Sequence, residues 1–295
     1  MVDEGVIGTD NAALWLNGNT SANLHCGVAV DSTNVSSLST GGSASLIASS
    51  IYLLGDMQGS PSGSSTLATS PTANNILKNQ TVPVADPYAG RVIPAHSSCA
   101  SYTGVSYASS GTLNPGVFCG GLSIGSNSHT AHVLNAGIYY IVGGTFSISA
   151  KASVVATGGV TFVLTGDSTH GYASATINGN ADVALSAPTS GPTGGMLFFQ
   201  DRNAPFSGTS GSNSSCGSGN AQNIINGGST QLLTGALYFP SQSLCFAGNS
   251  SLTGAGKCTQ IIARQISFTG TSDVKLSCAG TGIDPVTVAT PQLIK

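Results

Sequence analysis

The stretch that decides the fold is residues 14–22, which read LWLNGNTSA: an alternating apolar run, a Gly-Asn turn and a second run of small residues. The same kind of phrase returns at residues 38–46, 122–127, 146–152, 176–181 and 266–271. Gly18 and Gly42 are separated by the same interval as Leu122 and Phe146. That interval, about 24 residues, is the length of one coil of a β-solenoid, in which each coil covers the apolar face of the next. The phrase therefore predicts stacked coils.

The fold class that follows is all-β. Parallel strands stacked coil on coil explain β-branched runs such as residues 160–164 (VTFVL), and Gly and Asn suit the sharp corners between strands. A single Glu and Gly throughout argue against helices. We expect a right-handed parallel β-helix (β-solenoid) with two long loop excursions. A β-sandwich is the alternative, although it does not give a coil-length repeat of one phrase.

One domain accounts for the whole chain, residues 1–295, with two interruptions. From about residue 55 to 97 the alternation gives way to Pro, Gly and Ser, and Pro at this density does not fit inner strands. This excursion is either a long loop or a segment lying along the solenoid wall. A second excursion, residues 205–220, is nearly pure Ser, Gly and Asn.

Charge is scarce in this chain. Charged residues make up 6% of the sequence, against about 25% in ordinary soluble domains, and the formal net charge is −3. The lack of a basic cluster argues against nucleic acid as a partner. No apolar run is long enough to span a membrane, and residues 1–4 do not begin a signal peptide. The chain is then either cytosolic or numbered from a point after a removed targeting segment.

The seven cysteines favour export. None forms a C-x-x-C pair, and none groups with His at the spacing of a structural zinc site. Cysteines separated by close to the length of one coil would lie within disulfide reach on neighbouring coils. The predicted pairs are Cys99 with Cys119 and Cys258 with Cys278 on that spacing, and Cys216 with Cys245 around the second excursion. Cys26 is the odd one, and seven buried free thiols are the alternative.

An ordered series of phrases resembles the exported region of TadG-like proteins, which belong to the Flp (tight-adherence) pilus-assembly group of bacteria. The phrases are residues 26–30 (CGVAV), 42–51 (GSASLIASSI), 83–87 (PVADP), 114–121 (NPGVFCGG), 187–192 (APTSGP), 197–202 (LFFQDR) and 233–240 (LTGALYFP). The resemblance implies an extracytoplasmic domain in a pilus or adhesion context, usually carried behind an N-terminal membrane anchor. It implies no catalytic site. The family has a cysteine upstream of the position of Cys26, where residues 5–9 here read GVIGT, which leaves Cys26 unpaired.

An enzyme is the rival interpretation, because β-helices also carry polysaccharide lyases and glycoside hydrolases, and fold alone does not decide function. Catalysis on sugars usually needs two facing carboxylates, or calcium beside a basic side chain. The best candidates are Asp167, Asp201, Arg202 and His170. Asp182 could join them if stacking gathers the acids in one groove. The structural alternative is that Asp201 and Arg202 form a local ion pair or turn cap at a strand end.

Metal and cofactor sites find little support. His129 and His132 lie three residues apart, which on a strand places them on opposite faces, and no carboxylate is close in sequence. His25 beside Cys26 is a chance neighbour on a strand for the same reason. The turn at Asp86 is most simply a loop staple. We expect no metal and no cofactor.

Aromatic pairs fall on neighbouring predicted coils. Stacked aromatics inside a solenoid are normally core, but alternation along a strand turns one member of each pair outward. An exposed row would bind carbohydrate or a partner protein. The candidate binding residues are Tyr139, Tyr140, Phe199 and Tyr238.

The leading functional hypothesis is a secreted or cell-surface β-helical domain that binds a glycan or an envelope or pilus protein. Its basis would be a long, rigid, uncharged face rich in hydroxyl and amide groups. Any membrane attachment would come through an N-terminal anchor outside this sequence. An ice-binding solenoid is a third possibility, but the corners vary too much for flat regular Thr arrays.

Overall fold

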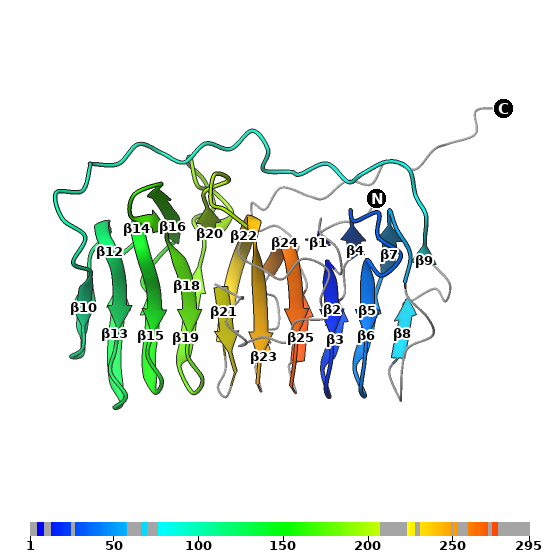
Figure 1. Cartoon of the computed structure of the whole chain (residues 1–295). Coiled ribbons are helices and arrows are strands. Elements are labelled where there is room, and N and C mark those ends of the chain that lie inside the picture. The colour runs from blue at the N-terminus through cyan, green and yellow to red at the C-terminus, as the bar shows by residue number, and fades with distance from the viewer. Residues whose placement is uncertain are drawn as a thin grey trace.

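Strands stacked side by side form the body of the computed structural model (Figure 1). The structure describes residues 5–8, 13–24, 27–57, 66–69, 76–206, 223–227, 231–248, 251–252, 259–270 and 273–276. No helix occurs within these ranges, and every strand pairing in them is parallel except one short hairpin. The prediction of an all-β fold built from parallel strands is confirmed.

The strands form three ladders, and each ladder takes one strand segment from each repeat of the chain. In stack order, the first ladder holds β12 (Gly116–Ile124), β14 (Gly137–Ile148), β16 (Val160–Asp167), β20 (Met196–Gln200), β22 (Gln231–Ala247), β24 (Thr259–Phe268), β1 (Gly5–Gly8), β4 (Gly27–Val30), β7 (Ser50–Leu53) and β9 (Ile76–Leu77).

The second ladder uses later parts of the long strands. It runs through β10 (Val105–Tyr107), the ends of β12 and β14, β18 (Ser174–Ile177), β21 (Asn223–Asn226), the ends of β22 and β24, β2 (Leu14–Leu16) and β5 (Leu38–Thr40). The hairpin strand β17 (Gly171–Tyr172) pairs with the end of β16.

The third ladder has two parts. The first part contains β11 (Gly111–Leu113), β13 (Thr130–Leu134), β15 (Ala152–Ala156), β19 (Asp182–Ser186) and the start of β22. The second part contains β23 (Ser251–Leu252), β25 (Asp273–Leu276), β3 (Ser21–Leu24), β6 (Ser45–Ala48) and β8 (Thr66–Thr69).

The repeat period in the sequence is the period of the stack. Leu122 pairs with Phe146, and Leu14 pairs with Leu38, which is the same interval along the chain in both cases. At the equivalent corners after β2 and β5, Gly18 and Gly42 both have positive φ, and a Cβ on Gly42 would lie 2.7 Å from the Gly18 carbonyl oxygen. Only glycine fits a corner where one backbone lies this close to the next.

The order of the repeats in the stack differs from their order in the sequence. The N-terminal strands do not start the stack at one end; they follow the C-terminal ones. Val6 in β1 pairs with Ile261 in β24, and Leu14 in β2 pairs with Ile266 in the same strand. The repeats of residues 5–77 therefore complete one end of a stack whose other end begins at β10 (Figure 1).

The larger hydrophobic cluster of the described residues lies between the three ladders, and we call it the inner core. Aromatic rings form its centre: Phe162 packs against Phe146 at 4.3 Å between ring centroids and against Phe198 at 5.2 Å. These rings are at most 1% exposed. The inward faces of all three ladders contribute to this cluster, so every repeat covers apolar surface of its neighbours.

Residues 78–104 contain no strand and connect β9 at one end of the stack to β10 at the other. We call this segment the strap. It crosses the whole length of the stack in Figure 1. Its contacts follow the order of the first ladder: the Tyr52 hydroxyl donates to the Val82 carbonyl at 2.6 Å, and the His96 ring lies 5.0 Å from that of Tyr140. The chain needs this long connection because its two groups of repeats are stacked out of sequence order.

The first excursion has other limits in the structure than those predicted from the sequence. Strands β8 and β9 lie inside residues 55–97, where the sequence pattern predicted none, and the segment that lies along the wall is 78–104. Most of the second excursion, residues 207–220, is outside the described residues.

Cys99 in the strap and Cys119 in β12 form a disulfide, with 5.8 Å between their Cα atoms. Cys245 is also disulfide-bonded. Its predicted partner Cys216 lies outside the described residues, as do Cys26, Cys258 and Cys278, so those pairings stay predictions.

Candidate functional site

A second hydrophobic cluster lies between the strap and the outer face of the first ladder, and we call it the strap layer. It contains Ala29, Tyr52, Val84, Tyr88, Tyr140, Val142, Val163, Met196, Phe199, Ala236, Tyr238 and Ile262. Tyr238 donates its hydroxyl to Asp86 at 2.7 Å, and its ring packs edge-on against Tyr88 at 5.5 Å. Burial, together with the Asp86 carboxylate, raises the pKa of Tyr238. Asp86 thus fastens the strap to β22.

The four aromatic residues predicted to bind a ligand belong to these two clusters. Tyr139 is fully buried in the inner core, and its hydroxyl donates to the carbonyls of Leu113 and Asn135. Tyr140, Phe199 and Tyr238 do point outward from the first ladder, as alternation requires, but the strap covers them to 9% exposure or less. They form no exposed binding row, because the sequence pattern gives no sign of what covers a strand's outer face.

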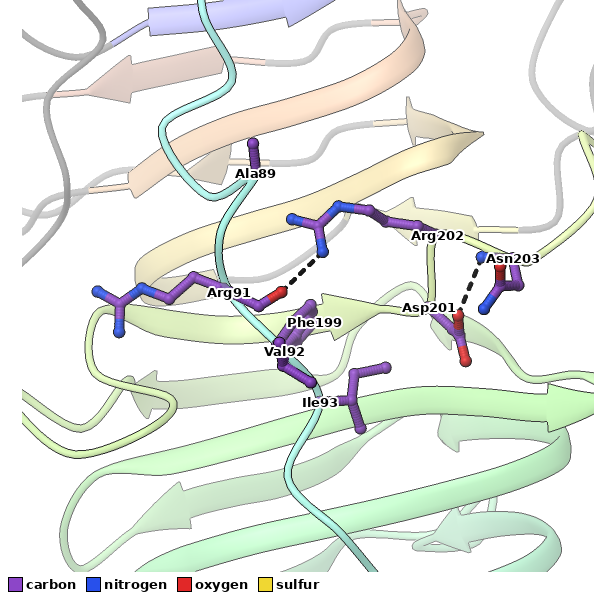
Figure 2. A pocket seen from close by; sticks show the side chains of 8 residues that line it. All are labelled: Ala89, Arg91, Val92, Ile93, Phe199, Asp201, Arg202 and Asn203. Atoms are coloured by element: carbon purple, nitrogen blue, oxygen red, sulfur yellow. Dashed lines mark hydrogen bonds between the residues drawn. The ribbon is translucent and has the colours of Figure 1, made fainter.

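A cavity of about 390 Å³ lies between the strap and the turn that follows β20. Figure 2 shows the side chains that line it. Its lining includes Asp201 and Arg202, two of the candidate catalytic residues. Arg202 donates through Nη1 to the Arg91 carbonyl at 2.8 Å and through Nη2 to the Tyr88 carbonyl. Its guanidinium lies 5.1 Å from the centroid of the Tyr238 ring. Arg202 therefore binds the strap backbone.

Asp201 is likewise occupied by local contacts. Its carboxylate accepts the Thr165 hydroxyl at 2.8 Å and the backbone N–H of Asn203 at 2.9 Å. The contact with Thr165 holds the turn after β20 against β16. The second excursion begins directly after this turn. The arrangement is that of a turn cap at a strand end, one of the two structural roles that the sequence left open.

Asp167 and His170 form a cluster with Tyr102 at the end of β16. Burial, and then the charges of Asp201 and Asp167, raise the pKa of Tyr172, so both carboxylates lie near that residue. The Asp167 carboxylate accepts the backbone N–H groups of Thr169 and His170 at 2.8 and 2.7 Å, the ring Nδ1 of His170 at 3.1 Å and the Tyr102 hydroxyl at 3.1 Å. The backbone and ring N–H groups of His170 lower the pKa of this carboxyl to about 2. A group that ionises so readily holds no proton at neutral pH, so it does not suit a general acid.

The Tyr102 and His170 rings are stacked face to face, 3.6 Å apart and within 4° of parallel. Tyr102 comes from the strap and His170 from the hairpin beside β17, so the stack joins two distant segments. Asp182 lies elsewhere, exposed at the start of β19 on the third ladder. The structure therefore brings Asp167 and His170 together but places Asp182 on a different ladder.

A second cavity, about 460 Å³, lies close to the Tyr102–His170 stack. Residues 103–106, 120–123 and 144–145 line it, and none of them is charged. We call it the hydroxyl groove. It spans three repeats at the corner between the first and second ladders. Tyr102 precedes its first lining residue, and a Cβ on the neighbouring Gly143 would lie 3.5 Å from the Tyr102 ring.

Two rows of hydroxyls extend across the outer face of the second ladder. Ser106, Ser123, Ser147 and Thr176 are paired in register on four successive repeats. The residues between them face the inner core, since Leu122, Ile124, Phe146 and Ile148 are fully buried. In the parallel row Thr145 lies opposite Ser174, with 3.2 Å between their hydroxyl oxygens.

No sequence pattern predicts the groove or the position of Tyr102. Tyr102 follows the Pro-rich excursion and has no repeat partner, so no pattern places it beside Asp167. The groove does leave a trace: the Gly-Gly pairs at residues 120–121 and 143–144 lie one repeat apart. Consecutive glycines at equivalent corners of two successive repeats indicate that the backbone there is not covered by side chains.

The two histidines at residues 129 and 132 lie in different surroundings. His132 is 1% exposed and faces the inner core, where burial lowers its pKa, while His129 is exposed. Among the residues that the structure describes, no three His, Cys, Asp or Glu side chains gather as metal ligands. In the same residues no helix is long and apolar enough to cross a membrane. His25 lies outside them.

No family model, curated protein or solved structure matches the chain. Any statement about function therefore rests on the geometry of the strap, the hydroxyl groove and the three ladders, together with the sequence patterns.

Proposed function

We propose that this chain is a secreted or surface-displayed binding domain, which acts in adhesion or in association with a pilus or the cell envelope, as its resemblance to TadG-like proteins implies. The three ladders would then close into one right-handed parallel β-helix. The observation that carries the proposal is the uncharged outer face of the second ladder, where hydroxyls are in register over four successive repeats. Such a face offers many hydrogen bonds and no strong electrostatic preference.

The disulfides support a place outside the cytosol. Cys99–Cys119 fixes the strap to β12, and Cys245 is bonded as well. Stable disulfides are characteristic of oxidising compartments. Together with the low charge of the sequence, they favour an exported domain.

Rigidity is the second support. The strap is held to strands at several points along the stack, through Tyr52, Asp86, Arg202 and Cys99. A surface whose side chains are already ordered loses little entropy when it binds. A long rigid stack therefore suits the presentation of a binding face.

The polysaccharide-enzyme hypothesis has weaker support. Arg202 donates to strap carbonyls, Asp201 accepts from Thr165 and Asn203, and Asp167 is saturated by four donors. A facing pair of carboxylates with room for a sugar between them, as glycosidases use, is not what these contacts describe.

The proposal is tested by presenting the purified chain to a glycan array and to isolated bacterial envelope and pilus fractions, with a parallel assay for degradation of the same polysaccharides. Retention on glycans or envelope material without release of cleaved products is the expected result. Turnover that disappears in Asp201→Ala would contradict it and establish the enzyme hypothesis instead.

A further inference from the structure

We propose that the hydroxyl groove is the binding site of an uncharged saccharide chain, which lies along the stack axis with one face against the Tyr102–His170 stack. This inference rests on the proposed binding function and names its site and ligand class.

Glycine backbone forms a large part of the groove lining, at Gly104, Gly120, Gly121 and Gly144. Gly120, Gly121 and Gly144 all have positive φ, and a Cβ on any of them would lie between 2.1 and 2.8 Å from neighbouring backbone atoms. The close packing of these backbones therefore requires glycine at these three positions, which form two successive corners. The hollow beside these glycines measures about 460 Å³ and is open to solvent, with Gly144 and Thr145 exposed in it.

The edges of the groove carry the groups that recognise sugars. Thr103, Ser106, Ser123 and Thr145 line it, and each hydroxyl both donates and accepts hydrogen bonds. Ser106 and Ser123 pair in register on adjacent repeats, so a ligand running along the stack meets a new hydroxyl about every 4.8 Å. A repeating polymer of hydroxyl-bearing units matches a repeating row of hydroxyls.

The Tyr102–His170 stack lies next to the groove, because Tyr102 immediately precedes the first lining residue. A pyranose ring carries hydroxyls on its rim and C–H groups on its faces, so it binds best where an aromatic plane and hydroxyl groups lie together. Gly143 lets the hairpin that carries His170 lie close to β14, because a Cβ there would be 3.2 Å from the His170 carbonyl oxygen. Asp167 is a positioning residue: its carboxylate holds both rings through the Tyr102 hydroxyl and the His170 ring nitrogen.

Charge selects among saccharides. No Lys or Arg lines the groove, and the Asp167 carboxylate accepts from the hydroxyl of Tyr102, the residue before its first lining residue. An acidic saccharide would meet a like charge without a compensating cation. The site therefore favours neutral hexose chains over those carrying uronate or phosphate groups.

The experiment is a calorimetric titration of the full chain with soluble neutral hexose oligosaccharides of increasing length, chosen from the array's strongest classes. Ser123→Tyr fills the groove. Ser153→Tyr, on a partly exposed strand position of the third ladder, is the matched control. We expect Ser123→Tyr to weaken binding by tenfold or more, roughly 1.4 kcal/mol, and Ser153→Tyr to bind like the parent. Thr145→Ala should weaken it several-fold, and thermal melting checks that each variant folds.

Each other result overturns the inference in a distinguishable way. Equal binding by the parent and Ser123→Tyr would place the glycan elsewhere and leave the proposed function standing. Tighter binding of acidic than of neutral oligosaccharides, or displacement of the glycan by extended peptides alone, would assign the groove to another ligand. If the parent binds no saccharide but is retained on pilus or envelope protein, only the groove inference fails. If it binds neither, both proposals fail.

Discussion

The inner core and the strap layer bury similar aromatic side chains by different means. In the inner core, Phe146, Phe162 and Phe198 lie between strand ladders that pair every repeat with the next. In the strap layer, Phe199 and Tyr238 are covered by a segment without a single strand, fixed by a disulfide and a few side-chain bonds. A ladder distributes its hold over many backbone hydrogen bonds, whereas the strap depends on a few attachments. Loss of one contact should therefore have different consequences in the two layers.

Phe198 and Phe199 provide the sharpest contrast, because they are adjacent in β20, each is 1% exposed, and they face opposite layers. Phe198→Ala should lower the free energy of unfolding by about 3–5 kcal/mol, since the ladders prevent the inner core from closing around the cavity. Phe199→Ala should cost less, about 2 kcal/mol, because the strap can settle into the space. Denaturant titration of both variants measures the difference. Equal losses would show that the strap is as rigid as the ladders.

Removal of the Cys99–Cys119 disulfide should cause the next largest loss of stability. Cys99→Ser removes a disulfide that links residues 20 positions apart, and closing a loop of that length is worth about 3 kcal/mol. The melting temperature of the parent should fall in reductant, while that of Cys99→Ser should fall less, because only its other disulfides remain. A variant that melts with the parent under oxidising conditions would contradict this.

The contrast between the two layers also explains what the sequence could predict. The repeat period determines which residues pair, since Leu14 must meet Leu38 if the strands stack, and it predicts that Phe162 and Phe198 lie inside. The repeat period does not show in which order the repeats are stacked. From the period alone, β24 could be the last strand of the stack or could pair with β1. The period also gives no sign that a strap covers Tyr140 and Tyr238. Those contacts depend on residues far apart in the chain and on no repeated pattern.

The site shows the same division. His170 and Asp167 are three residues apart, so their contact is local and could be proposed from sequence. Tyr102 completes the cluster from 65 residues away, and the groove depends on missing side chains rather than on reactive ones. Candidate sites are found in a sequence from reactive side chains, and glycine residues that line a groove have none.

A buried carboxyl makes one strap attachment sensitive to pH. Asp31 accepts the Val84 N–H with both carboxylate oxygens, and burial raises its pKa from 3.8 to about 6. Between these values the folded protein binds a proton that the unfolded chain has released. The contribution of Asp31 to stability is therefore full below about pH 3.8 and is lost as the pH rises through about 6.

Asp31→Asn tests this pH dependence, because the amide cannot ionise and its oxygen can still accept from Val84. The stability of the parent relative to Asp31→Asn should fall by up to about 2 kcal/mol between pH 4 and pH 7, after allowance for partial exposure. Denaturant titrations at several pH values give the difference directly. A difference that stays constant with pH would mean that Asp31 titrates normally.

The smallest effects come from the two tyrosine hydroxyls that hold the strap. Tyr238→Phe removes the hydrogen bond to the Asp86 carboxylate and should cost about 2 kcal/mol, because the acceptor is charged and the site is buried. Tyr52→Phe removes a bond to the neutral Val82 carbonyl and should cost about 1 kcal/mol. Both rings stay in place, so the variants isolate the hydroxyls. If the two losses add in the double variant, the strap is held by independent attachments; a combined loss larger than the sum would mean that the strap is released as one unit once either end is loosened.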